Sequence, residues 1–120
     1  MSVRCYFASL LVLTGCVEPF SPSAGWDEFE PPGQYRAWHA EVEVCLGVRQ
    51  SFDDIRWRKV YAETFPCGGT EIATGCIDYP RTIYVVEYLL DYEPLVKAEL
   101  IHYVRQDGPH DALFTRCGGR

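Results

Sequence analysis

The sequence has few cationic side chains, and this excludes several classes of partner. Its 120 residues contain 11 Lys and Arg against 17 Asp and Glu, which gives a net charge of −6. Because no basic stripe is present to neutralise phosphates, the composition argues against a nucleic-acid partner. A phosphate-cradling motif is also missing, since Gly68 and Gly69 follow Cys67 in a predicted turn with no helix after it.

Other catalytic arrangements and repeats are missing as well. The candidate serine nucleophiles, Ser21, Ser23 and Ser51, lie in segments predicted to be tether or turn, so no Ser/His/Asp set stands out. No internal repeat is visible, and the length allows one small domain. Aromatic residues are plentiful, with three Trp, eight Tyr and six Phe, so a compact core is possible at this size.

The N-terminal apolar run is too short to span a bilayer. Arg4 precedes an apolar stretch from Cys5 to Leu13, which is typical of a targeting segment. The next residues complete Leu13-Thr14-Gly15-Cys16, which resembles the bacterial lipobox, whose cysteine is lipidated and becomes the mature N-terminus. We therefore predict a lipoprotein signal peptide over residues 1–15 and a lipid anchor at Cys16. An ordinary signal peptide is the alternative.

Lipidation would attach the protein to a bacterial membrane. The predicted location is accordingly the cell envelope, on its periplasmic or extracellular face, with the membrane as one partner through the N-terminal lipid. Four cysteines remain after Cys16: Cys45, Cys67, Cys76 and Cys117.

An even number of cysteines in an oxidising compartment indicates two disulfides, for which three pairings are possible. We favour Cys67–Cys76 as a local link and Cys45–Cys117 as a long-range one. Zinc ligation by the cysteines is the alternative, which the lack of any C-x-x-C pair disfavours.

The rest of the chain predicts a tether followed by an α+β domain. Residues 16–34 combine the lipidated N-terminus with a Pro-, Ser- and Gly-rich segment that is typical of a flexible tether. The domain is expected over residues 35–120. Its predicted elements are a helix from Tyr35 to about Val48, strands over Ile55–Glu63 and Arg81–Tyr88, an irregular segment or hairpin arm over Glu71–Ile77, a helix over Glu93–Arg105 that stops by Gly108-Pro109, and an extended tail from His110.

The helix predicted over Glu93–Arg105 carries the candidate site. Glu99 and His102 lie on neighbouring turns, and His110 follows the helix. With a histidine at position 98 the helix would contain H-E-x-x-H, in which two imidazoles on one face hold zinc and the glutamate acts as general base. Position 98 is alanine. The alternative is an ordinary amphipathic helix whose Glu99 and His102 side chains are in solvent.

From Tyr35 to Cys117 the sequence resembles a group of small bacterial secreted or lipid-anchored proteins with zincin-like H-E-x-x-H helices. The matching segments keep their order: Tyr35-Arg36-Ala37-Trp38, Cys45-Leu46-Gly47, Ile55-Arg56-Trp57, Gly75-Cys76 ahead of Pro80, Ile83 to Glu87, Leu95 to His102 apart from Ala98, and His110 with Phe114 and Cys117. The resemblance implies a small zincin-like α+β domain: a helix, a short antiparallel or mixed sheet, the active-site helix and a C-terminal tail, cross-linked by disulfides.

The same resemblance implies roles for three residues. Glu99 would be the general base, and His102 and His110 would be zinc ligands. Because Ala98 removes the other helix ligand, we expect zinc binding to be weak or absent and metallopeptidase activity to be weak or lost. Zinc is the only cofactor with support in the sequence.

Three alternatives stay open, so whether the protein is an enzyme is undecided at this point. A substitute ligand could come from His39, Glu87 or Asp111 and restore a working site. The protein could instead be a non-catalytic binding lipoprotein, or a structural one, that keeps the zincin scaffold. For a peptide or protein partner, we expect the strand from Ile83 to Tyr88 to offer its edge through main-chain hydrogen bonds.

Overall fold

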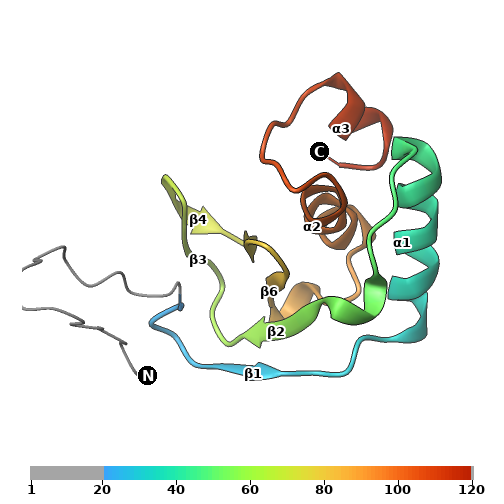
Figure 1. The fold of residues 1–120 in the computed structure, drawn as a ribbon. Helices are drawn as coiled ribbons and strands as arrows, with labels where there is room; N and C mark the ends of the chain where they lie inside the picture. The colour runs from blue at the N-terminus through green and yellow to red at the C-terminus, as the bar shows by residue number, and fades with distance from the viewer. Residues whose placement is uncertain (1–20, 120) are drawn as a thin grey trace, which may run out of the picture.

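The computed structural model describes residues 21–119, so the predicted signal peptide and the predicted anchor at Cys16 lie outside the described residues. The described chain is a mixed α+β fold with three α-helices, two sheets and two disulfides (Figure 1), which confirms the predicted α+β class. The helices are α1 (Gly33–Leu46), α2 (Glu93–Arg105) and α3 (Ala112–Arg116). The strands are β1 (Trp26–Glu28), β2 (Arg56–Val60), β3 (Phe65–Cys67), β4 (Thr70–Ala73), β5 (Gly75–Asp78) and β6 (Thr82–Val86), and two 3₁₀ turns are η1 (Phe52–Asp54) and η2 (Glu87–Leu89).

The main sheet has the strand order β1–β2–β6–β5. β2 and β6 run parallel, whereas β1 and β5 pair antiparallel with their neighbours. Because β6 is paired along both sides, the prediction that the strand Ile83–Tyr88 offers a free edge is wrong. The edge strands are β1 and β5. β5 lies partly within the segment Glu71–Ile77, which the sequence predicted as irregular or as a hairpin arm.

Two layers of side chains cover the main sheet. Trp57, Ile83 and Val85 face α1 and α2 and form the larger core with them. The alternate residues of β6, Tyr84 and Val86, point to the opposite face, as expected from the two-residue period of a strand. There they join a smaller cluster that contains Phe65 of β3. The β3–β4 hairpin is a separate two-stranded sheet (Figure 1), so it is attached to the main sheet by this packing and by a disulfide.

Helix α2 has the predicted bounds, and its environment decides between the two interpretations of Glu99 and His102. Pro94 lies in the first turn, where its missing N–H costs no helical hydrogen bond. Nine of the thirteen residues are buried, Glu99 and His102 among them. The alternative in which these two side chains are in solvent is therefore wrong. The helix ends before Gln106, which adopts a left-handed conformation with φ of 59°.

The residues from Trp26 onward are not a flexible tether. β1 pairs with β2, and Phe29 packs against Tyr35 and Trp57 with ring centroids 6.2 Å apart in both pairs. Helix α1 then begins at Gly33. The packed domain therefore begins before residue 35, because Phe29 contributes to the larger core and Trp26 to the smaller cluster.

The C-terminal tail also differs from the prediction. It was expected to be extended, whereas Ala112–Arg116 form α3. The reason is local: the Asp111 carboxylate accepts a hydrogen bond from the Phe114 amide (2.9 Å) and caps the first turn. Phe114 is fully buried and anchors this short helix on the domain.

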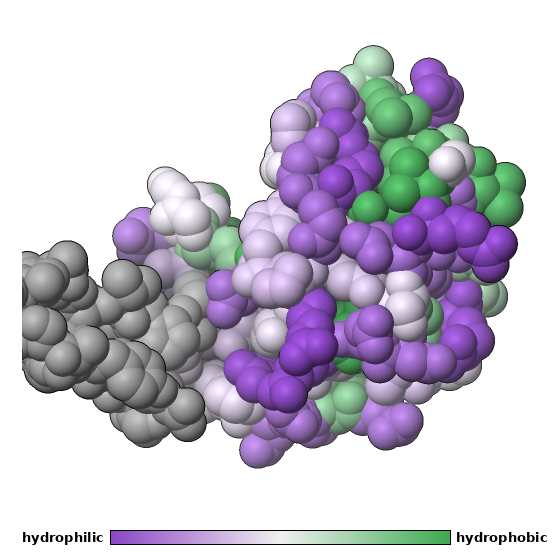
Figure 2. Space-filling view, viewed as in Figure 1, coloured by the Kyte–Doolittle hydropathy of each residue, from purple (hydrophilic) through white to green (hydrophobic). Residues whose placement is uncertain are grey.

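Both disulfides follow the favoured pairing. Cys45–Cys117 joins the end of α1 to the residue after α3, and Cys67–Cys76 joins β3 to β5. At the end of α1 the surface is apolar: Figure 2 shows apolar side chains gathered there and over α3, and Val44 is 83% exposed. Within residues 21–119, no helix has the length and hydrophobicity needed to cross a bilayer.

Candidate functional site

A cleft of about 630 Å³ lies between the β5 edge, the β3–β4 hairpin and the second half of α2. Glu99, His102 and His110 all line it. The remaining walls are formed by the hairpin turn from Cys67 to Thr70, by Gly75–Tyr79 and by Gly108. The structure therefore brings the predicted base and both predicted ligands into one cleft, although His110 comes from the loop after α2.

The two histidines face each other through their Nε2 atoms, which are 3.1 Å apart. His102 Nδ1 lies 3.0 Å from the carbonyl oxygen of Asp107. A carbonyl oxygen can only accept, so His102 Nδ1 carries the proton and the neutral ring has its lone pair on Nε2. His110 Nε2–H then donates to His102 Nε2. In this tautomer His102 directs toward the cleft the nitrogen that a metal ion would use.

Burial keeps His102 neutral. Its pKa is lowered, chiefly by desolvation and secondarily by its neighbours His110 and Arg105, although the Asp107 carbonyl acts in the opposite direction. The His110 ring is held from the other side by Phe114, with centroids 4.1 Å apart and ring planes within 6°. Phe114 thus holds the His110 ring in place by stacking on it.

Glu99 is the most strongly perturbed carboxyl group of the cleft. Its side chain is only 7% exposed, and burial raises its pKa to about 8. No hydrogen bond or ion pair within residues 21–119 compensates this desolvation. The carboxyl group packs directly on the backbone of β5: a Cβ added at Gly75 would lie 3.1 Å from Glu99 Oε2. A carboxyl group whose pKa is raised by burial, in one cleft with two imidazoles, is a candidate for proton transfer.

The separation of the two histidine nitrogens can be compared with that of two nitrogens bound to one zinc ion. Two Zn–N bonds of about 2.0–2.1 Å at a tetrahedral angle place their nitrogens about 3.3–3.4 Å apart, close to the observed separation. Among the described residues, however, no three His, Cys, Asp or Glu side chains form a group that could hold a metal ion. Ala98 lies one turn before His102, where the third ligand of the H-E-x-x-H pattern would be.

None of the three candidate substitute ligands lines this cleft. The Asp111 carboxylate is bound by Arg105 at 2.9 and 3.0 Å, and this guanidinium holds the pKa of Asp111 far below its usual range. His39 is buried in α1, with its Nδ1 atom 3.8 Å from Glu43 Oε1. Glu87 is exposed in η2. The fold therefore offers no replacement for the missing histidine from these positions.

Comparisons with known proteins give no relative. No protein-family model, no curated protein and no solved structure matches the chain. What the protein does must therefore be inferred from the residues of the cleft.

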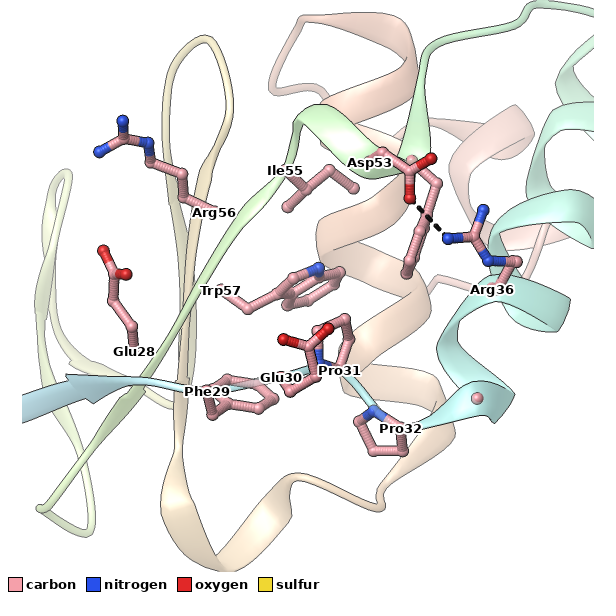
Figure 3. A pocket seen from close by; sticks show the side chains of 12 residues that line it. Glu28, Phe29, Glu30, Pro31, Pro32, Arg36, Asp53, Ile55, Arg56 and Trp57 are labelled. Carbon is pink, nitrogen blue, oxygen red and sulfur yellow. Dashed lines mark hydrogen bonds and ion pairs between the residues drawn. The ribbon is translucent and has the colours of Figure 1, made fainter.

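Two other pockets are lined by none of Glu99, His102 and His110. One, of about 330 Å³, lies between the start of α1 and β2 (Figure 3). Arg36 forms an ion pair with Asp53 across it (2.5 Å), and Trp57 lines it (Figure 3). The other, of about 400 Å³, is lined by His39 and Glu43. The perturbed acid and the histidine pair occur together in the β5 cleft and in neither of these.

The structure adds Tyr79, Asp107 and Asp78 to the site, none of which the sequence singled out. Tyr79 donates its hydroxyl hydrogen to the Asp107 carbonyl (2.7 Å), so this carbonyl is shared between Tyr79 and His102. Asp78 lines the cleft at the end of β5, and burial raises its pKa although Arg58 acts in the opposite direction. The sequence contained one signal for a strand at this position: Cys76 and Ile77 form a short apolar run between Gly75 and Pro80.

Proposed function

We propose that the protein is a bacterial envelope lipoprotein with a degenerate zinc-metallopeptidase-like site on a zincin-like scaffold, and that its peptidase activity is weak or lost. The observation that carries this proposal is the contact between His102 and His110, whose Nε2 atoms are 3.1 Å apart in the cleft that also contains Glu99. Two imidazoles and one desolvated carboxyl group are the base and two of the ligands of an H-E-x-x-H site.

In this proposal, His102 and His110 would hold a zinc ion through their Nε2 atoms, for which the proton on His110 Nε2 must first move to Nδ1, and Glu99 would be the base. Zinc supplies Lewis acidity toward a peptide carbonyl. Glu99 has a pKa of about 8, so most of it is protonated at neutral pH and cannot accept a proton. A nearby cation would lower that pKa and restore the base. The missing ligand weakens metal binding. Without a bound cation the pKa of Glu99 stays high, so the missing ligand also weakens the base.

The alanine at position 98 removes a large part of the free energy of zinc binding. A structural zinc site contributes about 10–16 kcal/mol, so one of three protein ligands accounts for several kcal/mol. A two-histidine site also fixes the geometry of the ion poorly, since water must complete its coordination.

The arrangement around the cleft supports a peptide as the ligand. β5 is an edge strand, and it lines the cleft together with Glu99 and His102. The main chain of an extended peptide can pair with such an edge, which adds a strand to the sheet. This proposal replaces the strand edge that the sequence had suggested with the one beside the histidines.

The envelope location has two supports. The Leu13-Thr14-Gly15-Cys16 motif resembles a lipobox, and the two disulfides are compatible with an oxidising compartment. The lipid would hold the domain at the membrane surface.

A non-catalytic binding or structural protein is the second candidate. Ala98 itself favours it, as does the lack of a third metal-binding side chain among the described residues. In this case the cleft would hold a peptide on the β5 edge without cleaving it, or would have no ligand at all.

Zinc content and peptide cleavage by the purified full chain separate these functions. For the degenerate site we expect detectable zinc at less than one ion per chain, weak or no chelator-sensitive cleavage of a mixed peptide substrate, and loss of any such cleavage in Glu99→Gln. Stoichiometric zinc with efficient cleavage would contradict the degenerate assignment. If zinc neither binds nor changes cleavage, and Glu99→Gln has no effect, the zinc-peptidase interpretation is wrong and the second candidate remains.

A further inference from the structure

Arg105, the last residue of α2, forms ion pairs with both aspartates that flank the loop of His110. Its Nε atom lies 3.0 Å from Asp107 Oδ1, and its two terminal nitrogens donate to the two carboxylate oxygens of Asp111 at 2.9 and 3.0 Å. The Arg105 side chain is only 15% exposed. The side chains of its partners Asp107 and Asp111 are about half exposed, so we rely on the geometry of the pair and not on its strength: a bidentate arginine–carboxylate fork fixes the relative orientation of its two groups.

The Asp111 end of this network leads to one face of His110. The Asp111 carboxylate accepts the Phe114 amide hydrogen (2.9 Å) and so begins α3. Phe114, which α3 carries, is buried completely and stacks on the His110 ring. Arg105 thus fixes the residue that caps the helix supporting His110.

The Asp107 end leads to His102. The Asp107 carbonyl accepts hydrogen bonds from His102 Nδ1 (3.0 Å) and from the Tyr79 hydroxyl (2.7 Å). Its position therefore determines both the tautomer and the orientation of the His102 ring. One guanidinium consequently holds the two ends of a five-residue loop whose fourth residue is His110.

We propose that Arg105 is a positioning residue that keeps the His110 ring within hydrogen-bond distance of His102 by fixing the loop from Asp107 to Asp111. It acts through that loop and not on a substrate or an ion. The role of the two histidines as zinc ligands rests on the function proposed above, whereas their contact in the metal-free chain does not.

Two substitutions in the full chain test this role, with a third as a matched control. Arg105→Gln removes the fork. Asp111→Asn removes the ion pair but keeps an N-cap, because asparagine caps helices about as well as aspartate. Arg36→Gln is the control, since it removes an arginine–aspartate pair in the pocket of Figure 3, which neither His102 nor His110 lines.

The first measurement needs no metal. Long-range ¹H–¹⁵N correlation of the imidazole rings, in the presence of a chelator, reports the tautomers of His102 and His110 and the hydrogen bond between them. We expect Arg105→Gln and Asp111→Asn to shift or broaden the signals of both rings, whereas Arg36→Gln leaves them at their original positions. Unchanged ring signals in a folded Asp111→Asn chain would overturn the proposal, even if Arg105→Gln failed to fold.

The second measurement is the zinc affinity of the same variants combined with Ala98→His. Removal of a residue that orients a metal ligand typically weakens binding about ten- to a hundredfold, and we expect a loss of that size for Asp111→Asn. Affinity equal to that of Ala98→His alone would contradict the positioning role. If Ala98→His itself bound no zinc, the proposed function would fail, but the ring signals would still decide whether Arg105 positions His110.

Discussion

At the scale of single residues, Glu99 is a carboxyl group that the fold removes almost completely from water. A glutamate that is 7% exposed and has no compensating partner among the described residues keeps its proton to about pH 8, instead of releasing it near 4.5. Each unit of pKa shift corresponds to about 1.4 kcal/mol between the two protonation states. Such a group reduces stability whenever it ionises, which is common at sites selected for chemistry.

This predicts a pH dependence of stability. Between pH 4.5 and about 8 the folded chain binds the Glu99 proton and the unfolded chain does not, so the free energy of unfolding falls as the pH rises through this window. His102 and His39 have lowered pKa values and act in the opposite sense below pH 6.5. Comparison with Glu99→Gln removes their contribution because both chains share it.

The measurement is urea unfolding of both chains at pH 5 and pH 8, with a chelator present. We expect the wild-type chain to lose more stability than Glu99→Gln over this interval, by a few kcal/mol at about 1.4 kcal/mol per pKa unit. An equal pH dependence in the two chains would mean that Glu99 is solvated.

At the scale of elements, the contact between β5 and α2 forms the floor of the cleft. Gly75 is the residue that allows it: a Cβ there would lie 2.7 Å from Leu95 Cδ1 and 3.1 Å from Glu99 Oε2. We expect Gly75→Ala to destabilise the chain by about 1–3 kcal/mol, because it overpacks this contact and displaces the Glu99 carboxyl.

Gly69→Ala in the hairpin turn is the matched control. No atom lies within 4 Å of the added Cβ, so its effect should stay within about 0.5 kcal/mol. Thermal or urea unfolding measures both. Equal stability of the two variants would show that β5 and α2 are not in close contact.

The long elements and the local site pattern could be predicted from the sequence, whereas the short elements could not. Helix α2 has enough apolar positions and a clear N-terminal signal, so its bounds were predicted correctly. β1, β5 and α3 have only three to five residues each, and tertiary pairing or one side-chain cap decides their conformation. The same limit applies to the cleft: Glu99, His102 and His110 could be selected through the incomplete H-E-x-x-H pattern and the resemblance, but the edge strand beside them depends on long-range pairing.

At the scale of the whole molecule, two disulfides cross-link a small domain. Cys45–Cys117 spans 72 residues and Cys67–Cys76 spans nine. In the chain-entropy account, a longer loop gives a larger stabilisation, because more freedom is removed from the unfolded chain. The two bonds also hold different parts of the site, the hairpin wall in one case and α3 in the other.

We expect Cys45→Ser with Cys117→Ser to cost about 4 kcal/mol, and Cys67→Ser with Cys76→Ser about 2.5 kcal/mol. Urea unfolding of the two double variants gives the order directly. A larger loss from the short loop would contradict the entropic account. It would indicate that the hairpin depends on its disulfide more than on the packing of Phe65.

We propose above that His102, His110 and Glu99 form a zinc-peptidase-like site that lacks one ligand, at position 98. The most direct test is the zinc affinity of the wild-type chain beside Ala98→His, with Val44→His as a control that adds a histidine at an 83% exposed position away from the cleft. One ligand contributes several kcal/mol, so at about 1.4 kcal/mol per tenfold change we expect Ala98→His to bind zinc at least a hundredfold more tightly than wild type. Val44→His should leave the affinity unchanged. If Ala98→His binds no better than wild type, or if Val44→His gains as much, the cleft is not a zinc site missing one histidine.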